Sequence, residues 1–122
     1  MRISTILGRV FMEIRRGEVW SVLWTGLAGK PRPALVVQSE RFRTTDTDIL
    51  ALITSQENDS EHLRVPVRAD AENGLITDSF ICLDKLMAIP VSNLGRKFGV
   101  VSAEVMRKVD ENLIKILGLG ES

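Results

Sequence analysis

The segment KPRPALVVQ, residues 30–38, places two cations between two prolines and then runs directly into an apolar stretch. Each proline fixes its own φ and disfavours helical geometry in the residue before it, so Lys30 and Arg32 are both held extended. Residues two apart in an extended chain face the same side, about 6 to 7 Å from each other. The segment therefore predicts a short buried strand, residues 34–37, whose entrance carries two preorganised cations suited to an anion.

Length and charge limit the function classes. A chain of 122 residues forms one domain and buries roughly two thirds of its unfolded surface. With 16 basic and 16 acidic residues the formal charge is zero, so affinity for a polyanion has to come from the placement of charges. Between residues 2 and 43 the chain has eight basic side chains and three acidic ones, so its N-terminal third is basic.

The chain lacks signals for a membrane or for an oxidising compartment. No run approaches the 18 or more apolar residues of a membrane span, and the single Cys82 cannot form an internal disulfide. We therefore expect a cytoplasmic protein without membrane contact. We expect residues 1–14 to be an N-terminal extension that is poorly ordered or results from an alternative start, and residues 15–119 to form the domain.

Apolar and β-branched runs predict further strands at residues 17–23, 49–53, 62–67, 79–83 and 85–89. Residues 91–99 are interpreted as a turn-rich connection. From Ser102 onward, apolar residues recur at helical spacing up to Gly118. The sequence thus predicts a mainly β (α+β) fold, a small antiparallel β-barrel with a C-terminal α-helix on its side.

Strand pairing places hydroxyls beside Arg32. If residues 34–38 form a hairpin with residues 49–53 and Gln38 lies opposite Ile49, Arg32 lies opposite Ser55 with Thr54 next to it. The ten-residue connection can hold a bulge, so Thr54 and Ser55 both stay candidates.

A fixed guanidinium beside hydroxyls suits a phosphodiester, because charge develops on the non-bridging oxygens. In RNA the nucleophile is already the 2′-OH of the substrate, so neither a metal nor a cofactor is required. One His and one Cys give no metal-ligand spacing, and His62 is interpreted as a solvated loop residue. The competing interpretation is that Arg32 pairs with Glu18 or Asp48 on the surface.

Short motifs of this sequence, in their order and spacing, resemble the MazF/PemK family of toxin endoribonucleases over residues 15–119. They are RGEVW at 16–20, KPRPALVV at 30–37, LITS at 52–55, GL at 74–75, DS at 78–79, LD at 83–84, LGR at 94–96 and VDE at 109–111.

The resemblance implies an SH3-like barrel and a homodimer that is neutralised by a cognate antitoxin. It also implies an mRNA interferase, a sequence-specific endoribonuclease independent of metals and ribosomes. Such an enzyme cleaves single-stranded mRNA and leaves a 2′,3′-cyclic phosphate and a 5′-OH. Carried over position by position, the catalytic residues are Arg32 and Thr54. The substrate-binding residues are Lys30, Pro31, Ser55, Gln56 and Lys85.

Three departures from the family pattern leave the cut sequence open: the short loop 26–29, Leu23 with Trp24, and Lys85 where a glutamine often stands. Two alternatives remain on the same fold. One is a CcdB-like gyrase-inhibiting toxin, which acts through a C-terminal Trp-Gly-Ile, whereas this chain ends in residues 119–122, LGES. The other is an inactive barrel that only binds an antitoxin or RNA.

Overall fold

The structure is a computed structural model that describes residues 3–6, 9–23, 29–43, 46–56 and 63–121, with side chains described from Glu13 onward. A six-stranded antiparallel sheet has the order β6-β7-β5-β4-β3-β8. Its strands are β3 (Glu18–Val22), β4 (Arg32–Val36), β5 (Thr47–Thr54), β6 (Arg64–Val67), β7 (Ser79–Pro90) and β8 (Leu94–Val100). One helix follows the sheet, α1 (Ala103–Ile116).

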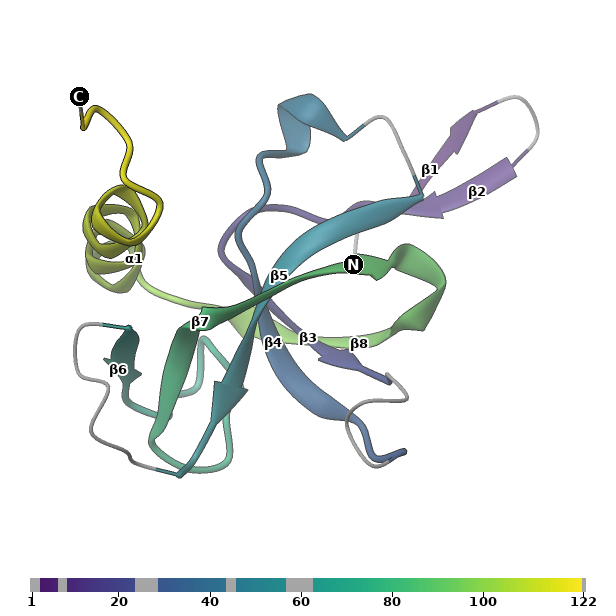
Figure 1. The fold of residues 1–122 in the computed structure, drawn as a ribbon. Coiled ribbons are helices and arrows are strands. Elements are labelled where there is room, and N and C mark those ends of the chain that lie inside the picture. The colour runs from purple at the N-terminus through teal and green to yellow at the C-terminus, as the bar shows by residue number, and fades with distance from the viewer. Residues whose placement is uncertain (1–2, 7–8, 24–28, 44–45, 57–62, 122) are drawn as a thin grey trace.

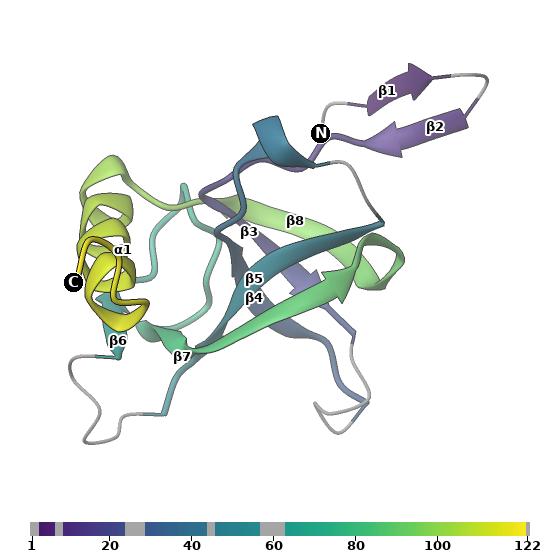
Figure 2. The ribbon, with the colours of Figure 1, turned by 45° about the horizontal axis from the view of Figure 1, so that its top comes forward.

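The sheet is strongly curled, with the long strands β5 and β7 crossing its centre and α1 lying at the side of β6 (Figures 1 and 2). The predicted mainly β, antiparallel fold with a C-terminal helix is confirmed. β6 and β8 are the two ends of the hydrogen-bonded ladder, so the sheet curls without closing into a complete ring. None of the described residues forms a helix long and apolar enough to cross a bilayer.

Strand β4 is buried on both faces, as its continuous apolar run predicts. Leu35 lies in the cluster that packs against Val109 of α1. Its neighbours Ala34 and Val36 point to the opposite face and pack in a second cluster around Trp20. Burying a side chain such as Leu35 stabilises the fold by about 1.5 to 3 kcal/mol, so β4 anchors the two halves of the core together.

The C-terminal helix begins and ends near the predicted residues. The Ser102 side chain accepts a hydrogen bond from the Val105 backbone N–H at 3.1 Å and so caps the first turn. Glu104 lies in the first turn and Lys115 in the last, which suits the helix dipole. Gly118 follows with φ +66°, a conformation that ends a helix readily.

One region differs from the prediction. Residues 91–99 were predicted to be a connection, but they contain a 3₁₀ turn, Val91–Asn93, and most of strand β8, which pairs with β3. The polar residues of this segment interrupt the apolar pattern that would predict a strand. The segment forms a strand because it pairs with β3. Within the expected extension, β1 (Ile3–Ile6) and β2 (Arg9–Met12) form a separate hairpin that projects from one end of the molecule (Figure 1).

Trp24, His62 and three residues of the shortened loop, 26–28, lie outside the described residues.

Candidate active site

Strands β4 and β5 bring Arg32 and Thr54 to the same position of the sheet. The observed pairs, from Ala34 with Leu52 to Val36 with Leu50, differ by one residue from the predicted register. Continued toward the start of β4, this register sets Arg32 directly opposite Thr54, and cross-strand partners share a face of the sheet.

A β-bulge explains the difference in register. The backbone N–H groups of Val37 and Gln38 both donate to the Ile49 carbonyl, at 3.1 and 3.2 Å. Two residues of one strand therefore oppose one residue of the other. Gln38 lies opposite Ile49 as predicted. From there toward the start of β4, the extra residue shifts each pair by one, so Arg32 lies opposite Thr54 rather than Ser55.

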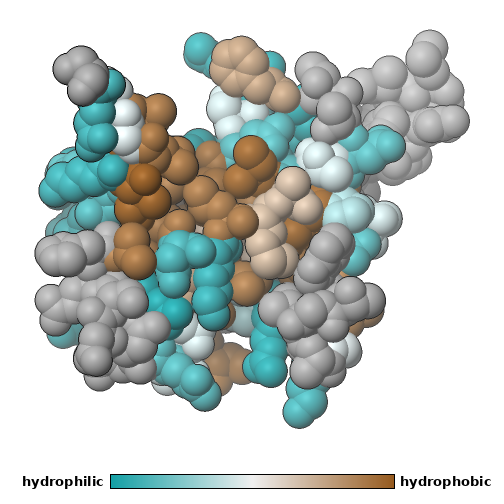
Figure 3. Space-filling model, in the orientation of Figure 1, coloured by the Kyte–Doolittle hydropathy of each residue, from teal (hydrophilic) through white to brown (hydrophobic). Residues whose placement is uncertain are grey.

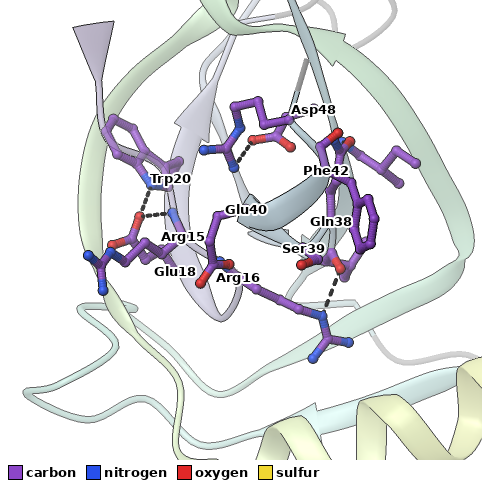
Figure 4. A network of polar contacts seen from close by, with 12 residues as sticks. Arg15, Arg16, Glu18, Trp20, Gln38, Ser39, Glu40, Phe42 and Asp48 are labelled. Atoms are coloured by element: carbon purple, nitrogen blue, oxygen red, sulfur yellow. Dashed lines mark hydrogen bonds and ion pairs between the residues drawn. The ribbon is translucent and has the colours of Figure 1, made fainter. Parts of the chain in front are cut away.

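The Arg32 side chain is exposed and forms no ion pair or hydrogen bond with any residue that the structure describes. The two carboxylates considered as surface partners are engaged elsewhere (Figure 4). Glu18 pairs with Lys97 at 2.9 Å and accepts from the Trp20 indole N–H at 3.0 Å. Asp48 pairs with Arg43 at 2.7 Å. Pairing of Arg32 with Glu18 or Asp48 is therefore wrong, and the guanidinium is free for a ligand.

Thr54 is the last residue of β5 and is half-buried. Its Oγ1 accepts a hydrogen bond from the Gln56 backbone N–H at 3.2 Å. This local turn fixes the Thr54 side chain and leaves its O–H hydrogen to donate elsewhere. Ser55 and Gln56 follow as exposed residues of the same turn.

A cavity of about 550 Å³ contains most of the predicted site. The predicted residues that line it are Pro31, Arg32, Thr54, Ser55, Gln56 and Lys85. Lys30 is exposed beside Pro31 but is not part of the lining. The volume lies in the range of pockets that enclose a small ligand.

The described lining of the cavity is cationic and rich in hydroxyl groups. It carries no carboxylate or imidazole. Its cations are Arg32, Lys85 and Arg96, and its hydroxyls belong to Thr54, Ser55, Thr77 and Ser79. Such a lining attracts an anion and supplies several hydrogen bonds to it.

Cys82 also lines the cavity, but it is buried, and burial raises the pKa of its thiol. It therefore stays protonated and is a poor nucleophile. No group of three or more His, Cys, Asp or Glu side chains that could hold a metal ion occurs in the part of the chain that the structure describes.

Sequence reasoning missed Arg96 and Phe98 as site residues, because it assigned them to a connection. Both lie on β8, two residues apart, and line the cavity. The segment 74–77 lines it as well. Recognition of β8 as a strand would have placed the two side chains on one face.

Close backbone contact holds the 74–77 segment against β8. Gly74 has φ +69°, and a Cβ at this position would lie 2.2 Å from the Phe98 carbonyl oxygen. The buried Asn73 secures the turn, since its side chain donates to the Arg68 carbonyl at 2.8 Å and accepts from the Leu75 N–H at 2.9 Å. The 74–77 segment therefore packs directly on β8 at this wall of the cavity.

Comparison with known proteins gives consistent matches. Residues 15–117 match the model of the PemK-like, MazF-like toxin of type II toxin-antitoxin systems. A probable endoribonuclease MazF of Mycolicibacterium smegmatis is 31% identical over 87% of this chain and 98% of its own length. Endoribonuclease EndoA of Bacillus subtilis is 33% identical over 84% of this chain and 92% of its own length.

The fold matches as well. A solved mycobacterial endoribonuclease, in complex with its cognate antitoxin, superimposes with a TM-score of 0.73 at 22% identity, covering 90% of this chain and 100% of that one. Because the family model spans most of the sequence, and a 31% identical relative is covered almost from end to end, this chain belongs to the PemK-like, MazF-like family of toxins of type II toxin-antitoxin systems.

Proposed function

We propose that this toxin is a sequence-specific endoribonuclease that cleaves single-stranded mRNA without a metal ion or the ribosome. The observation that carries this proposal is Arg32, exposed and unpaired among the described residues, at the register position opposite Thr54 in a cationic cavity. The two curated relatives are named as endoribonucleases, which supports RNA as the anion.

In the proposed reaction the 2′-oxygen of the substrate attacks the adjacent phosphorus while the bond from phosphorus to the 5′-oxygen breaks. The products are a 2′,3′-cyclic phosphate and a 5′-OH, and the proton of the 2′-OH is balanced by the proton that the leaving oxygen gains. Because the nucleophile belongs to the RNA, the protein has to orient it and stabilise the developing charge.

Arg32 would stabilise the negative charge on the non-bridging oxygens, since a planar guanidinium donates two parallel hydrogen bonds to a phosphate. The Thr54 hydroxyl already accepts from the Gln56 N–H, so its hydrogen can be donated to the phosphate or the leaving oxygen. Lys85, Ser55, Gln56 and Pro31 would hold the nucleotides that flank the cut. Lys30 would contact a phosphate at the entrance.

A homodimer in the cytoplasm and neutralisation by a cognate antitoxin complete the proposal. The matched family is one of toxin-antitoxin systems. Apolar surface gathers between α1 and strands β5 and β7 (Figure 3). Exposed apolar side chains on these elements are Ile49 of β5, Ile114 of α1 and Leu117 at the end of α1. Contiguous apolar surface of this kind is typical of a protein interface, and a second copy is the occupant we propose.

The proposal is tested by incubating the wild-type protein with a long unstructured RNA in the presence of EDTA and mapping the new 5′ ends. We expect cleavage at a short recurring sequence, with 2′,3′-cyclic phosphate and 5′-OH termini and no inhibition of gyrase supercoiling. Loss of cleavage in EDTA would overturn metal independence. Gyrase inhibition without RNA cleavage would favour the CcdB-like alternative.

A further inference from the structure

The cavity holds an arginine that the proposed reaction does not use. The Arg96 guanidinium carbon lies 5.0 Å from the centroid of the Phe98 ring, within the range of a cation–π contact. Both side chains line the cavity that also contains Arg32 and Thr54. The arginine is thus positioned over a ring rather than beside a carboxylate.

The ring beneath Arg96 is held in place from several sides. Phe98 is half-buried and packs against the core cluster that includes Leu35. Its carbonyl is in close contact with Gly74, and Gly99, the next residue, lies against the Glu72 carbonyl with no room for a Cβ. One turn therefore holds the backbone at Phe98, and the core cluster packs against its ring.

The backbone of Arg96 is held by a hydrogen bond, whereas its side chain is exposed. Its backbone N–H donates to the Ser21 hydroxyl at 2.8 Å. Its side chain is exposed and makes no ion pair with a described residue. Because Phe98 lies on one side of the guanidinium and the side chain is exposed, a planar group can approach it from the cavity.

Unpaired nucleic-acid bases stack on aromatic rings and on arginine guanidinium planes. We propose that Arg96, supported by Phe98, stacks on the base of a nucleotide that flanks the scissile phosphate and so contributes to sequence specificity. A purine is preferred, because its two fused rings cover more of the guanidinium. This inference rests on the proposed RNA cleavage and adds a substrate-binding residue to it.

The test compares Arg96→Lys with the wild type on short RNAs that contain the mapped cut site. Lysine keeps the charge and its attraction to Phe98 but offers no flat surface for a base. Arg107→Lys is the matched control, because Arg107 is an exposed arginine of α1 that does not line the cavity. On a substrate with a purine at the stacked position we expect Arg96→Lys to lower kcat/KM by roughly 5- to 100-fold.

Two readouts separate stacking from a general structural effect. With an abasic nucleotide at the stacked position, the wild-type rate should fall to the Arg96→Lys rate. With 2-aminopurine there, in an RNA that carries a 2′-deoxy group at the cut, the wild type and Arg107→Lys should quench the fluorescence. Arg96→Lys should not.

The inference is overturned if Arg96→Lys quenches 2-aminopurine and cleaves both substrates as the wild type does. That result, together with wild-type cleavage that depends on Arg32, would leave the proposed function intact. If the wild type cleaves no RNA at all, the proposed function itself fails.

Discussion

Arg32 can act on a ligand because its side chain is exposed and none of the described carboxylates pairs with it. Glu18 is bound by Lys97 and Trp20, and Asp48 by Arg43. The flanking prolines fix the backbone, and the strand register sets Thr54 across from the arginine. The site is therefore preorganised at the level of single residues.

Lys30 and Arg32 carry the same charge but should behave differently. Because Lys30 is exposed outside the cavity lining, Lys30→Ala should weaken RNA binding mainly through one lost phosphate contact. We expect the slope of log K against log salt to fall by about one, with the cut sequence unchanged. Binding titrations over a range of salt concentrations measure this slope. An unchanged slope would place Lys30 away from the RNA.

The ion pair of Asp48 with Arg43 should give stability an identifiable pH dependence. Asp48 is fully buried, and desolvation raises the pKa of its carboxyl above the ordinary value of 3.8 although Arg43 opposes the shift. The folded chain therefore keeps this proton to higher pH than the unfolded chain does. The stability that the raised pKa of Asp48 contributes is fully present below pH 3.8. It is lost as pH rises through the pKa of Asp48 in the folded chain.

The direction of this change of stability with pH is measured by denaturant unfolding of the wild type and Asp48→Asn at matched pH values. The difference in unfolding free energy, wild type minus variant, should fall as pH rises from about 4 and then level off. A difference that grows with pH would mean that the attraction of Arg43 outweighs burial.

At the scale of elements, the sequence predicts what local signals encode. The apolar run of β4 and the capped, periodic α1 are both confirmed. β8 was missed because its pairing with β3 and its contacts with the Gly74 turn, rather than its own composition, make it a strand. Arg96 and Phe98 were missed with it.

The register between β4 and β5 could not be predicted from the sequence, for a similar reason. A bulge at Val37 and Gln38 depends on how the whole hairpin packs. Pairing alone therefore left Thr54 and Ser55 both open, and only the family resemblance favoured Thr54.

The turn that carries Gly74 should be more sensitive to substitution than another glycine with positive φ. Gly74→Ala would set a Cβ 2.2 Å from the Phe98 carbonyl oxygen, in addition to the backbone strain of about 1 to 2 kcal/mol. Gly29→Ala is the matched control, because Gly29 has φ +72° but nothing within 4 Å of the added atom.

We expect thermal unfolding to show a clearly larger loss for Gly74→Ala than for Gly29→Ala. RNA cleavage should fall as well in Gly74→Ala, since β8 forms a wall of the cavity. Equal losses of stability in the two variants would mean that the 74–77 turn does not rest on β8.

For the whole molecule, we propose that the N-terminal hairpin is not part of the domain that carries the site. Among the strands that the structure describes, β1 pairs with β2 and with no other, and the family match begins at residue 15. Ile14 is fully buried in the core, so the domain needs this residue. A protein that begins at Glu13 should keep its RNA cleavage rate and lose less than about 1 kcal/mol of unfolding free energy. Unfolding and cleavage assays on both lengths check this, and a larger loss would make the hairpin part of the domain.

The central claim is that Arg32 and Thr54 act together on one phosphate, and a double-mutant cycle on kcat/KM tests it most directly. Arg32→Ala and Thr54→Val should each lower RNA cleavage by roughly 10² to 10³ with the fold intact. Because the two groups serve the same transition state, the double variant should be little slower than the slower single variant. Losses that multiply in full, or either single variant cleaving at the wild-type rate, would contradict the claim.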